Sequence, residues 1–308
     1  MRKQIMGIAE IYRKIIPIYW RYKISNFRKA GPEKRLLKEI KAGRFKEEYP
    51  TEWEYLVSKN AIVPFPYTFH DEYICKNVDV FRDSSCKMLY VIHDGKRLYF
   101  PKGWAKTFVQ KYYLSLIEEQ NVRSPHRYFP KDDSFVDGSI FFDVGAAEGI
   151  ISLSVIDRID RAVLFEADPM WREALNQTFA GYKDKIQIIS KYCSDEVSDL
   201  ETTLDEEYKK IIDGGYASES ETRCVVKADV EGMEMKVLSG STSLLESNLA
   251  SFLICLYHHP NDEETIERFL QGYRRECDVI EKTDGYIFYG VEAGDPSFRR
   301  GLIRLIRK

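Results

Sequence analysis

The chain has 308 residues, 44% of them hydrophobic and 31% charged, which is the balance of a globular protein with a large core. A formal net charge of -3 removes the general argument for nucleic-acid binding, although a local basic segment remains. The cysteines are scattered singly and show no zinc-ligand spacing, so we expect reduced thiols and no metal site.

We expect residues 1–60 to form a helical extension. Apolar residues between Ile11 and Trp20 recur at helical spacing, and a second helix is expected from Pro32 to Lys41, ended by Gly43. One interpretation is a helical layer whose basic face is solvated. The other is a basic amphipathic surface that touches anionic lipid or holds a polyanionic substrate.

The opening segment MRKQIMGIAEIYRK has no uninterrupted apolar region and no small-residue cleavage site. The whole sequence also lacks an uncharged apolar stretch of the length that spans a bilayer. We therefore expect a cytoplasmic protein, with peripheral membrane association through the basic helix as the alternative.

We expect residues 61–138 to form a lead-in segment, which consists of short strands and one helix and precedes the main sheet. Met88–Ile92 and Arg97–Phe100 flank a turn containing Asp94 and Gly95, which indicates a β-hairpin. Phe108, Tyr112 and Leu116 share one face of a helix expected over Ala105–Gln120.

Residues 139–308 alternate strand and helix, which favours a mostly parallel sheet covered on both faces. The expected strands are Ile140–Asp143, Ala162–Glu166, Ile186–Ser190, Cys224–Asp229 and Phe252–Tyr257. Tyr286–Tyr289 and Leu302–Arg307 have no helix between them, so we expect them to pair antiparallel at one edge of the sheet.

The turn after the first of these strands indicates a nucleoside-containing cofactor. FFDVGAAEG runs from Phe141 to Gly149, and Glu166 follows about 20 residues later, placed to accept from both ribose hydroxyls. The loop lacks the G-x-G-x-x-G pattern that cradles a pyrophosphate. Its acidic residues, Asp143 and Glu148, suit a cationic cofactor such as S-adenosylmethionine.

Other strand ends are also polar, and such ends line the ligand crevice of an open parallel sheet. They carry Ser194 and Asp195, Asp229 and Glu231, and His258 and His259. Asp195 can contact an adenine amino group, or it can be a solvated loop carboxylate. His126 and Tyr128, just before the first strand, can close over the cofactor, or can pack as an ordinary loop.

The segment VVKADVEGMEMKVLSG, together with DVGAAEG, LFEADP, ETTLDEEY and LYHHPND, resembles the FkbM-type family of S-adenosylmethionine-dependent methyltransferases. The resemblance covers roughly Pro125 to Gly290, and DVEG with its following E-x-x-V-L-x-G is the most specific part. Family members commonly carry a polar residue such as Asn at the position of Ala147. Residues 1–60 lie outside the resemblance.

The resemblance implies a Rossmann-like class I methyltransferase sheet, mostly parallel with an antiparallel strand at one edge. It also implies that the motif around Asp143, Gly145, Ala146 and Gly149 binds the methionine moiety and that Glu166 holds the ribose. We add Ser194, Asp195 and Tyr128 as cofactor contacts. The reaction that it implies is O-methylation, often of a sugar hydroxyl in a glycan or natural product, as in polysaccharide biosynthesis.

Methylation of a hydroxyl calls for a general base, and Asp229, Glu231 and His258 are the candidates. Among them we favour His258 paired with Asp229. Two alternatives stay open. One is methylation of RNA or protein, although no Asn-Pro-Pro-Tyr-like motif follows the fourth strand, and we expect no nucleic-acid partner. The other is a noncatalytic module that keeps the fold and binds other proteins.

Overall fold

The computed structural model describes residues 31, 33–216, 218, 221–247, 249–291 and 294–307. The chain divides into a smaller unit, residues 1–68 with 288–298, and a larger unit, residues 69–287 with 299–308. In the described ranges, every helix is too short or too polar to cross a lipid bilayer. The helix expected around residues 11–20, and with it the basic surface, lies outside those ranges.

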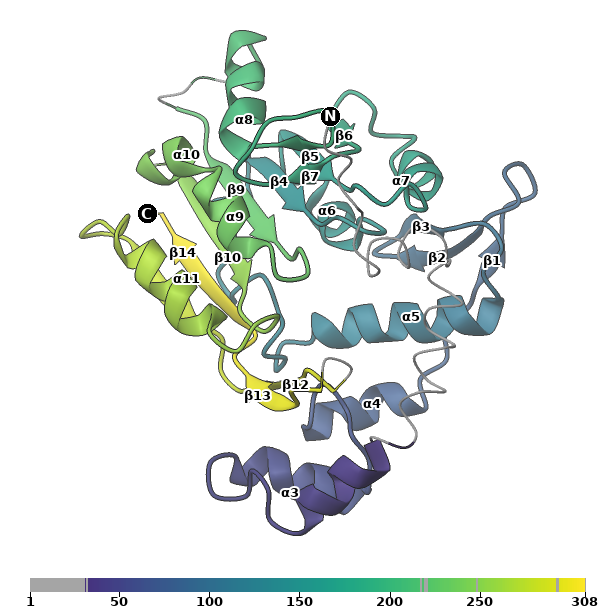
Figure 1. Cartoon of the computed structure of the whole chain (residues 1–308). Helices are drawn as coiled ribbons and strands as arrows, with labels where there is room; N and C mark the ends of the chain where they lie inside the picture. Colours follow the sequence, from purple (N-terminus) through teal and green to yellow (C-terminus); the bar gives the residue numbers. More distant parts are fainter. Residues whose placement is uncertain are drawn as a thin grey trace, which may run out of the picture. The chain divides into compact units, whose positions relative to one another are not determined.

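A seven-stranded sheet organises the larger unit (Figure 1). Its strands are β4 (Ile140–Val144), β5 (Arg161–Phe165), β6 (Ile186–Ile189), β9 (Cys224–Ala228), β10 (Ala250–Cys255), β11 (Val279–Lys282) and β14 (Leu302–Ile306). The order across the sheet is β11-β14-β10-β9-β4-β5-β6. The five strands from β10 to β6 pair in parallel, whereas β14 is antiparallel to both of its neighbours. This arrangement confirms the predicted class I methyltransferase sheet.

The prediction for the last strands was wrong in its pairing. β14 does not pair with the segment around Tyr286–Tyr289 and does not lie at the edge, because β11 flanks it on the outside. Instead β12 (Ile287–Tyr289) pairs with β13 (Ser297–Arg299). All but the last residue of β14 are buried, as expected for an interior strand with both faces covered.

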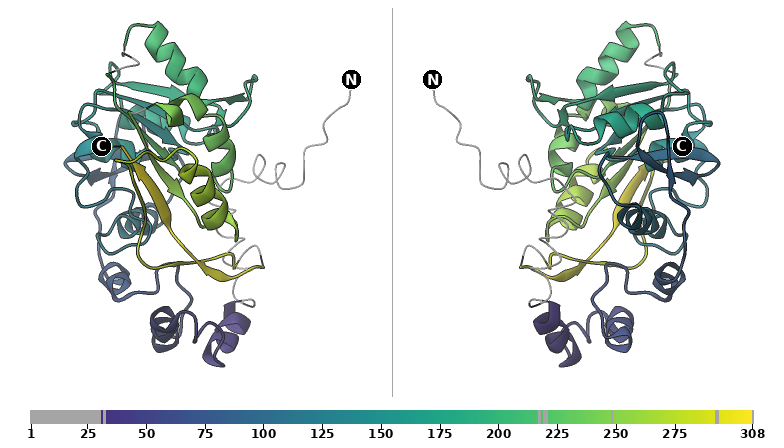
Figure 2. Two further views of the ribbon diagram at one scale, coloured as in Figure 1. Left: turned by 90° about the vertical axis from the view of Figure 1, so that its left-hand side faces the viewer. Right: turned by 90° about the vertical axis from the view of Figure 1, so that its right-hand side faces the viewer.

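Helices cover both faces of this sheet (Figures 1 and 2). One face packs a large apolar core against α8 (Leu204–Asp213), α9 (Glu234–Ser239), α10 (Thr242–Glu246) and α11 (Asp262–Gln271). That core takes Phe142 and Val226, so alternation turns Asp143 and Lys227 to the opposite face. The opposite face is the one that α6 (Ile150–Val155) covers, because Ser152 hydrogen-bonds to Asp143 there.

The lead-in forms the predicted hairpin and helix. β2 (Leu89–His93) and β3 (Lys96–Phe100) pair antiparallel, with β1 (Phe81–Arg82) beside β2. Asp94 and Gly95 both have positive φ, as a two-residue hairpin turn requires. α5 (Lys106–Glu119) matches the predicted helix, and α4 (Asp71–Ile74) precedes the hairpin. α7 (Arg172–Thr178) packs on β3.

Two short strands, β7 (Tyr192–Cys193) and β8 (Glu201–Thr202), pair in parallel and form a small sheet separate from the main one. Thr68–His70 and Ser134–Val136 form short 3-10 turns. The partition into 1–60, 61–138 and 139–308 stays a prediction.

The smaller unit is built on aromatic packing. Residues 33–41 are helical as predicted, and α3 (Pro50–Lys59) follows with Pro at its start. Phe45 contacts Phe288 and Phe298 at ring-centroid distances of 5.8 and 5.3 Å, and Tyr49 lies 4.7 Å from Phe298. The 288–298 segment therefore belongs to the same core as the helices that precede residue 68.

Candidate active site

The turn after β4 approaches the end of β9 closely. Gly145 has φ 76°, and a side chain there would overlap the carbonyl oxygen of Asp229. Ala147 and Gly149 also have positive φ. A turn of this shape favours residues without a side chain, and Asn tolerates it better than Ala. The polar residue common in the resembled family at position 147 therefore suits the backbone conformation found here.

Glu166, directly after β5, holds this turn in place. One carboxylate oxygen accepts from the Ala147 N–H at 2.9 Å, and the other accepts from the Asp168 N–H at 2.7 Å. Burial raises the pKa of Glu166, and these two backbone hydrogen bonds oppose that rise. A carboxylate has about four acceptor positions, so Glu166 can still accept two more hydrogen bonds.

Asp143, the first acidic residue of the turn motif, is 1% exposed and lies beneath the turn. Its carboxylate accepts from the Ser152 hydroxyl at 2.7 Å and lies 3.0 Å from Lys227 Nζ. Lys227 stands opposite Asp143 in the β4–β9 register and also donates to the Gly145 carbonyl at 2.7 Å. Burial opposes its charge, but Asp143 and Asp229 raise the pKa of Lys227 above its usual range. This ion pair ties the turn to β9.

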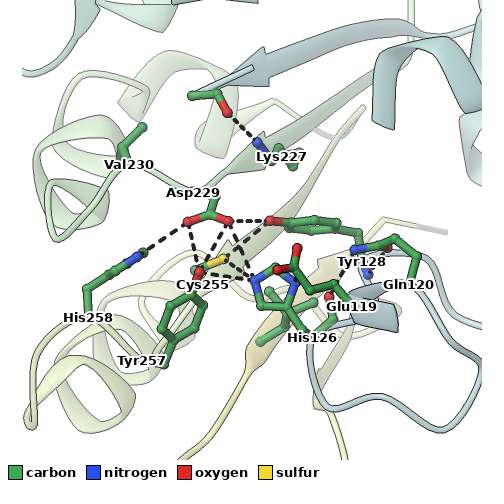
Figure 3. Close-up of polar contacts among 12 residues, drawn as sticks. Glu119, Gln120, His126, Tyr128, Lys227, Asp229, Val230, Cys255, Tyr257 and His258 are labelled. Carbon is green, nitrogen blue, oxygen red and sulfur yellow. Dashed lines mark hydrogen bonds and ion pairs between the residues drawn. The ribbon is translucent and has the colours of Figure 1, made fainter. Parts of the chain in front are cut away.

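Asp229, at the carboxyl end of β9, is the centre of a polar cluster (Figure 3). Its carboxylate accepts from the Tyr128 hydroxyl at 2.6 Å and from the Tyr257 hydroxyl at 3.2 and 3.3 Å. The Nε2 atoms of His126 and His258 lie 3.5 and 3.4 Å from its two oxygens. Burial would raise the pKa of Asp229, but His126, Lys227 and His258 together hold it well below its usual range. Asp229 is therefore ionised.

His258 is held from behind by Glu234. Its Nδ1 lies 2.8 Å from Glu234 Oε1, and Glu234 is 1% exposed. Burial would lower the pKa of His258, but Glu234 and Asp229 raise it to about 9. The imidazole is then cationic at neutral pH, so the two carboxylates flank a positive charge.

Glu234 also organises the DVEG turn, because it accepts from the Val230 N–H at 2.9 Å. Gly232 lies under the ring of His259, and a side chain at this glycine would collide with that ring. His259 Nε2 is 3.2 Å from the Gly232 carbonyl. One histidine of the pair thus contacts Asp229, and the other packs on the turn.

The segment before β4 brings His126 and Tyr128 to the cluster. His126 Nε2 is 3.1 Å from the Tyr257 hydroxyl, and Arg304 on β14 donates to the Tyr128 carbonyl at 2.7 Å. Arg299 donates to the carbonyls of Tyr257 and His258 at 3.0 and 2.8 Å. The hydroxyl of Tyr128, a residue predicted to contact the cofactor, donates its hydrogen bond to Asp229.

α5 contributes two further polar groups. The Tyr112 hydroxyl donates to Glu148 in the turn at 3.0 Å, and Glu119 Oε2 is 4.0 Å from His126 Nδ1. Burial is the main cause that raises the pKa of Glu119 well above its usual range, and the charges of Asp229 and Glu148 add to it. Carboxylates from α5, the turn and β9 thus lie within electrostatic reach of one another.

Two of the predicted cofactor contacts follow a different strand from the one expected. Ser194 and Asp195 follow β7, not β6, because the chain leaves the main sheet after Ile189. The Ser194 side chain is buried in its own turn, and Asp195 lies 3.7 Å from Lys236 on α9. Glu231 has φ 55° and an exposed side chain. The charge of Glu231 reaches Tyr257 and His258 of the cluster, and the predicted roles of the three residues stay predictions.

Within the part of the chain that the structure describes, two sets of side chains have donor atoms within 4.8 Å of one another, the spacing of a potential metal site. They are His126 with Asp229 and Cys255, and Asp229 with Glu234 and His258. Hydrogen bonds and ion pairs also link these groups, and Cys255 Sγ lies 3.9 Å from His126 Nε2 and 3.6 Å from the Tyr128 hydroxyl.

Several residues of the site did not emerge from the sequence as candidates. These are Tyr112, Glu119, Lys227, Glu234, Tyr257 and Arg299. Two of them carried a signal: Lys227 is a charge inside an apolar strand, and Glu234 lies in the E-x-x-V-L-x-G element. The positions of the others in the site depend on contacts between segments that are distant in the sequence.

No protein-family model matches the sequence, and no curated protein matches it either. Among solved structures, the chain is similar to the methyltransferase FkbM from Methylobacillus flagellatus, with 15% identity and a TM-score of 0.39 over 66% of this chain and 56% of that one. It is also similar to an rRNA methylase from Streptococcus thermophilus, with 11% identity and a TM-score of 0.34 over 57% of this chain and 92% of that one.

A third similarity is to precorrin-6y C5,15-methyltransferase from Geobacter metallireducens, with 9% identity and a TM-score of 0.36 over 70% of this chain and 93% of that one. The chain thus spans little more than half the length of the FkbM structure. Similarities this low carry no argument about activity, and the fold assignment stands on the strand order itself.

Proposed function

We propose that this protein is an S-adenosylmethionine-dependent O-methyltransferase that acts on a hydroxyl of a sugar, glycan or related small molecule. The observation that supports it most is the Asp229 cluster. Its carboxylate is ringed by two phenols and two imidazoles, and the backbone carbonyl of the same residue lies against Gly145 in the turn. Such a group can orient an acceptor hydroxyl beside a bound cofactor.

The residues present fit the cofactor. The turn from Gly145 to Gly149, which includes Ala146, would hold the methionine moiety through its backbone. Glu166 would accept hydrogen bonds from the ribose hydroxyls. When bound, S-adenosylmethionine supplies an electrophilic methyl group on a positively charged sulfur. The carboxylates around the turn favour that charge.

In this proposal Asp229 accepts a hydrogen bond from the acceptor hydroxyl and fixes its direction. We assign His126 as the base that takes the proton from this hydroxyl, because His126 lies beside both Asp229 and the Tyr257 hydroxyl. This assignment revises the predicted role of His258, because an imidazole whose pKa is raised to about 9 is already protonated. As a cation, His258 instead keeps Asp229 ionised, and Glu231 remains a candidate to contact the acceptor.

Cofactor binding is tested by isothermal titration calorimetry with S-adenosylmethionine and S-adenosylhomocysteine. We expect both to bind the wild type and Glu166→Ala to weaken binding by about 1.5–3 kcal/mol, the range for hydrogen bonds to a charged group. Glu173→Ala is the control, because that side chain is 57% exposed and pairs with Lys102. Absence of binding by folded wild type would support the noncatalytic module instead.

Methyl transfer is tested with labelled S-adenosylmethionine and a panel of glycans, RNA and peptides. His126→Ala and Asp229→Asn should each lower turnover on a glycan acceptor by about 100-fold or more, with cofactor affinity retained. EDTA should leave turnover unchanged. Full turnover in both variants would contradict the proposed roles, and transfer only to RNA or peptide would contradict the acceptor class.

A further inference from the structure

Glu148 is a buried carboxylate that the reaction proposed above does not use. It is 3% exposed, although it lies in the turn that would hold the cofactor. The Tyr112 hydroxyl of α5 donates to its Oε2 at 3.0 Å. The Tyr112 ring in turn packs against Trp171 and Trp104, at centroid distances of 6.0 and 5.3 Å. Glu148 is therefore held in one position by a helix from outside the sheet.

Charged groups from three elements face Glu148, besides the neutral hydroxyl of Tyr112. They are Glu119 from α5, Asp143 from β4 and Lys227 from β9. Lys227 is already paired with Asp143 through a 3.0 Å contact. His258 lies between Asp229 and Glu234, so neither buried cation forms an ion pair with Glu148 in the described ranges, and a cationic ligand would supply that partner.

We propose that Glu148, positioned by Tyr112, makes this site prefer the positively charged cofactor over its demethylated product. The inference rests on the proposed function, because it concerns the same site. S-adenosylmethionine and S-adenosylhomocysteine share the adenosine and the amino-acid group, and they differ by one methyl group and one positive charge at sulfur. A buried carboxylate beside the turn interacts with that charge only in the methyl donor.

A pH dependence follows from the burial of Glu148. Burial raises the pKa of Glu148 to about 7, against the hydrogen bonds from its own backbone and Tyr112 and the charge of Lys227. A cation nearby favours the ionised form, so binding of the charged cofactor releases a proton when the pH is near or below that pKa. Affinity for S-adenosylmethionine should therefore fall as pH drops through 7, whereas affinity for S-adenosylhomocysteine should change little.

The experiment measures both dissociation constants by calorimetry between about pH 6 and 8, in two buffers with different ionisation enthalpies so that released protons are counted. The variants are Glu148→Gln, which keeps the shape and removes the charge, and Tyr112→Phe, which keeps the ring and removes the hydroxyl. Glu264→Gln is the control, because its side chain is 82% exposed on α11.

For the wild type we expect a preference for S-adenosylmethionine that grows with pH and proton release near neutral pH. Glu148→Gln should reduce that preference by about tenfold at pH 8 and abolish its pH dependence, with binding of S-adenosylhomocysteine nearly unchanged. Tyr112→Phe removes a hydrogen bond that lowers the pKa of Glu148, so it should shift the pH dependence of the preference to higher pH. This variant keeps the inference testable if Glu148→Gln fails to fold.

Equal affinity for both ligands at every pH, or a Glu148→Gln variant that keeps the wild-type preference, would overturn the inference and leave the proposed function standing. Binding of neither ligand by folded wild type would overturn the proposed function itself. The two failures are therefore distinguishable in one series of titrations.

Discussion

At the scale of single residues, Gly145 shows how the first turn is constrained from two sides. Its φ of 76° disfavours any side chain, and the Asp229 carbonyl occupies the space where a Cβ would lie. The same residue accepts from Lys227 through its own carbonyl at 2.7 Å. One glycine thus joins the candidate cofactor turn to the strand that carries the polar cluster.

Gly145→Ala should destabilise the fold by about 1–3 kcal/mol or more, because overpacking and a left-handed backbone both add cost. It should also weaken S-adenosylmethionine binding, since the turn must move away from Asp229. Gly181→Ala is the matched control, because no atom lies within 4 Å of the added Cβ. Urea unfolding checks both variants, and equal stability of the two would show that the turn adapts freely.

At the scale of elements, buried arginines link β14 and the residue that follows it to neighbouring segments. Arg304 donates to the Tyr128 carbonyl and lies 2.7 Å from Glu281 on β11. Arg307 forms a buried ion pair with Asp278 and donates to the carbonyls of Ala250 and Tyr273. These contacts join β14 to β10, to β11 and to the segment before β4, so the last strand supports the candidate site.

Arg307→Ala should destabilise the protein by about 3–5 kcal/mol, because it leaves Asp278 as an uncompensated buried charge. Arg268→Ala should change stability by less than about 1 kcal/mol, since its side chain is 72% exposed and its pair with Glu264 spans 3.5 Å. Chemical denaturation of both variants gives the comparison. A difference near zero between them would mean that water reaches Asp278.

At the scale of the whole molecule, the chain leaves the larger unit after Ile287 and returns at Arg299. The excursion contributes Phe288 and Phe298, which are 4% and 5% exposed, to the aromatic core of the smaller unit. Removal of residues 1–68 would deprive both rings of the partners Phe45 and Tyr49. Large exposed apolar groups of this kind promote association.

A chain lacking residues 1–68 should therefore aggregate, whereas the same deletion with 288–298 replaced by a short Gly/Ser linker should stay monodisperse. Size-exclusion chromatography followed by S-adenosylmethionine titration tests both, and the second chain should retain binding. If the simple deletion were monomeric and soluble, Phe288 and Phe298 would not depend on the helices before residue 68.

The sequence by itself determined most strands of the main sheet and the turn that follows the first of them. Apolar periodicity is a local property, so the hairpin, α5 and the strands β4, β5, β6, β9, β10 and β14 were predictable. The turn at Gly145 and the acidic residue Glu166 were predictable too, because spacing along one strand–turn–helix unit sets their positions. β11 was missed because its four residues, Val-Ile-Glu-Lys, give too short and too mixed a pattern.

Only the tertiary structure decided which side chains meet. Lys227 faces Asp143 because of the β4–β9 register, and Glu234 reaches His258 because α9 begins beside the end of β10. His126 and Tyr112 come from segments outside the sheet, and their approach to Asp229 and Glu148 depends on packing. Register and packing are set by contacts between residues far apart in the chain, and local patterns do not encode them.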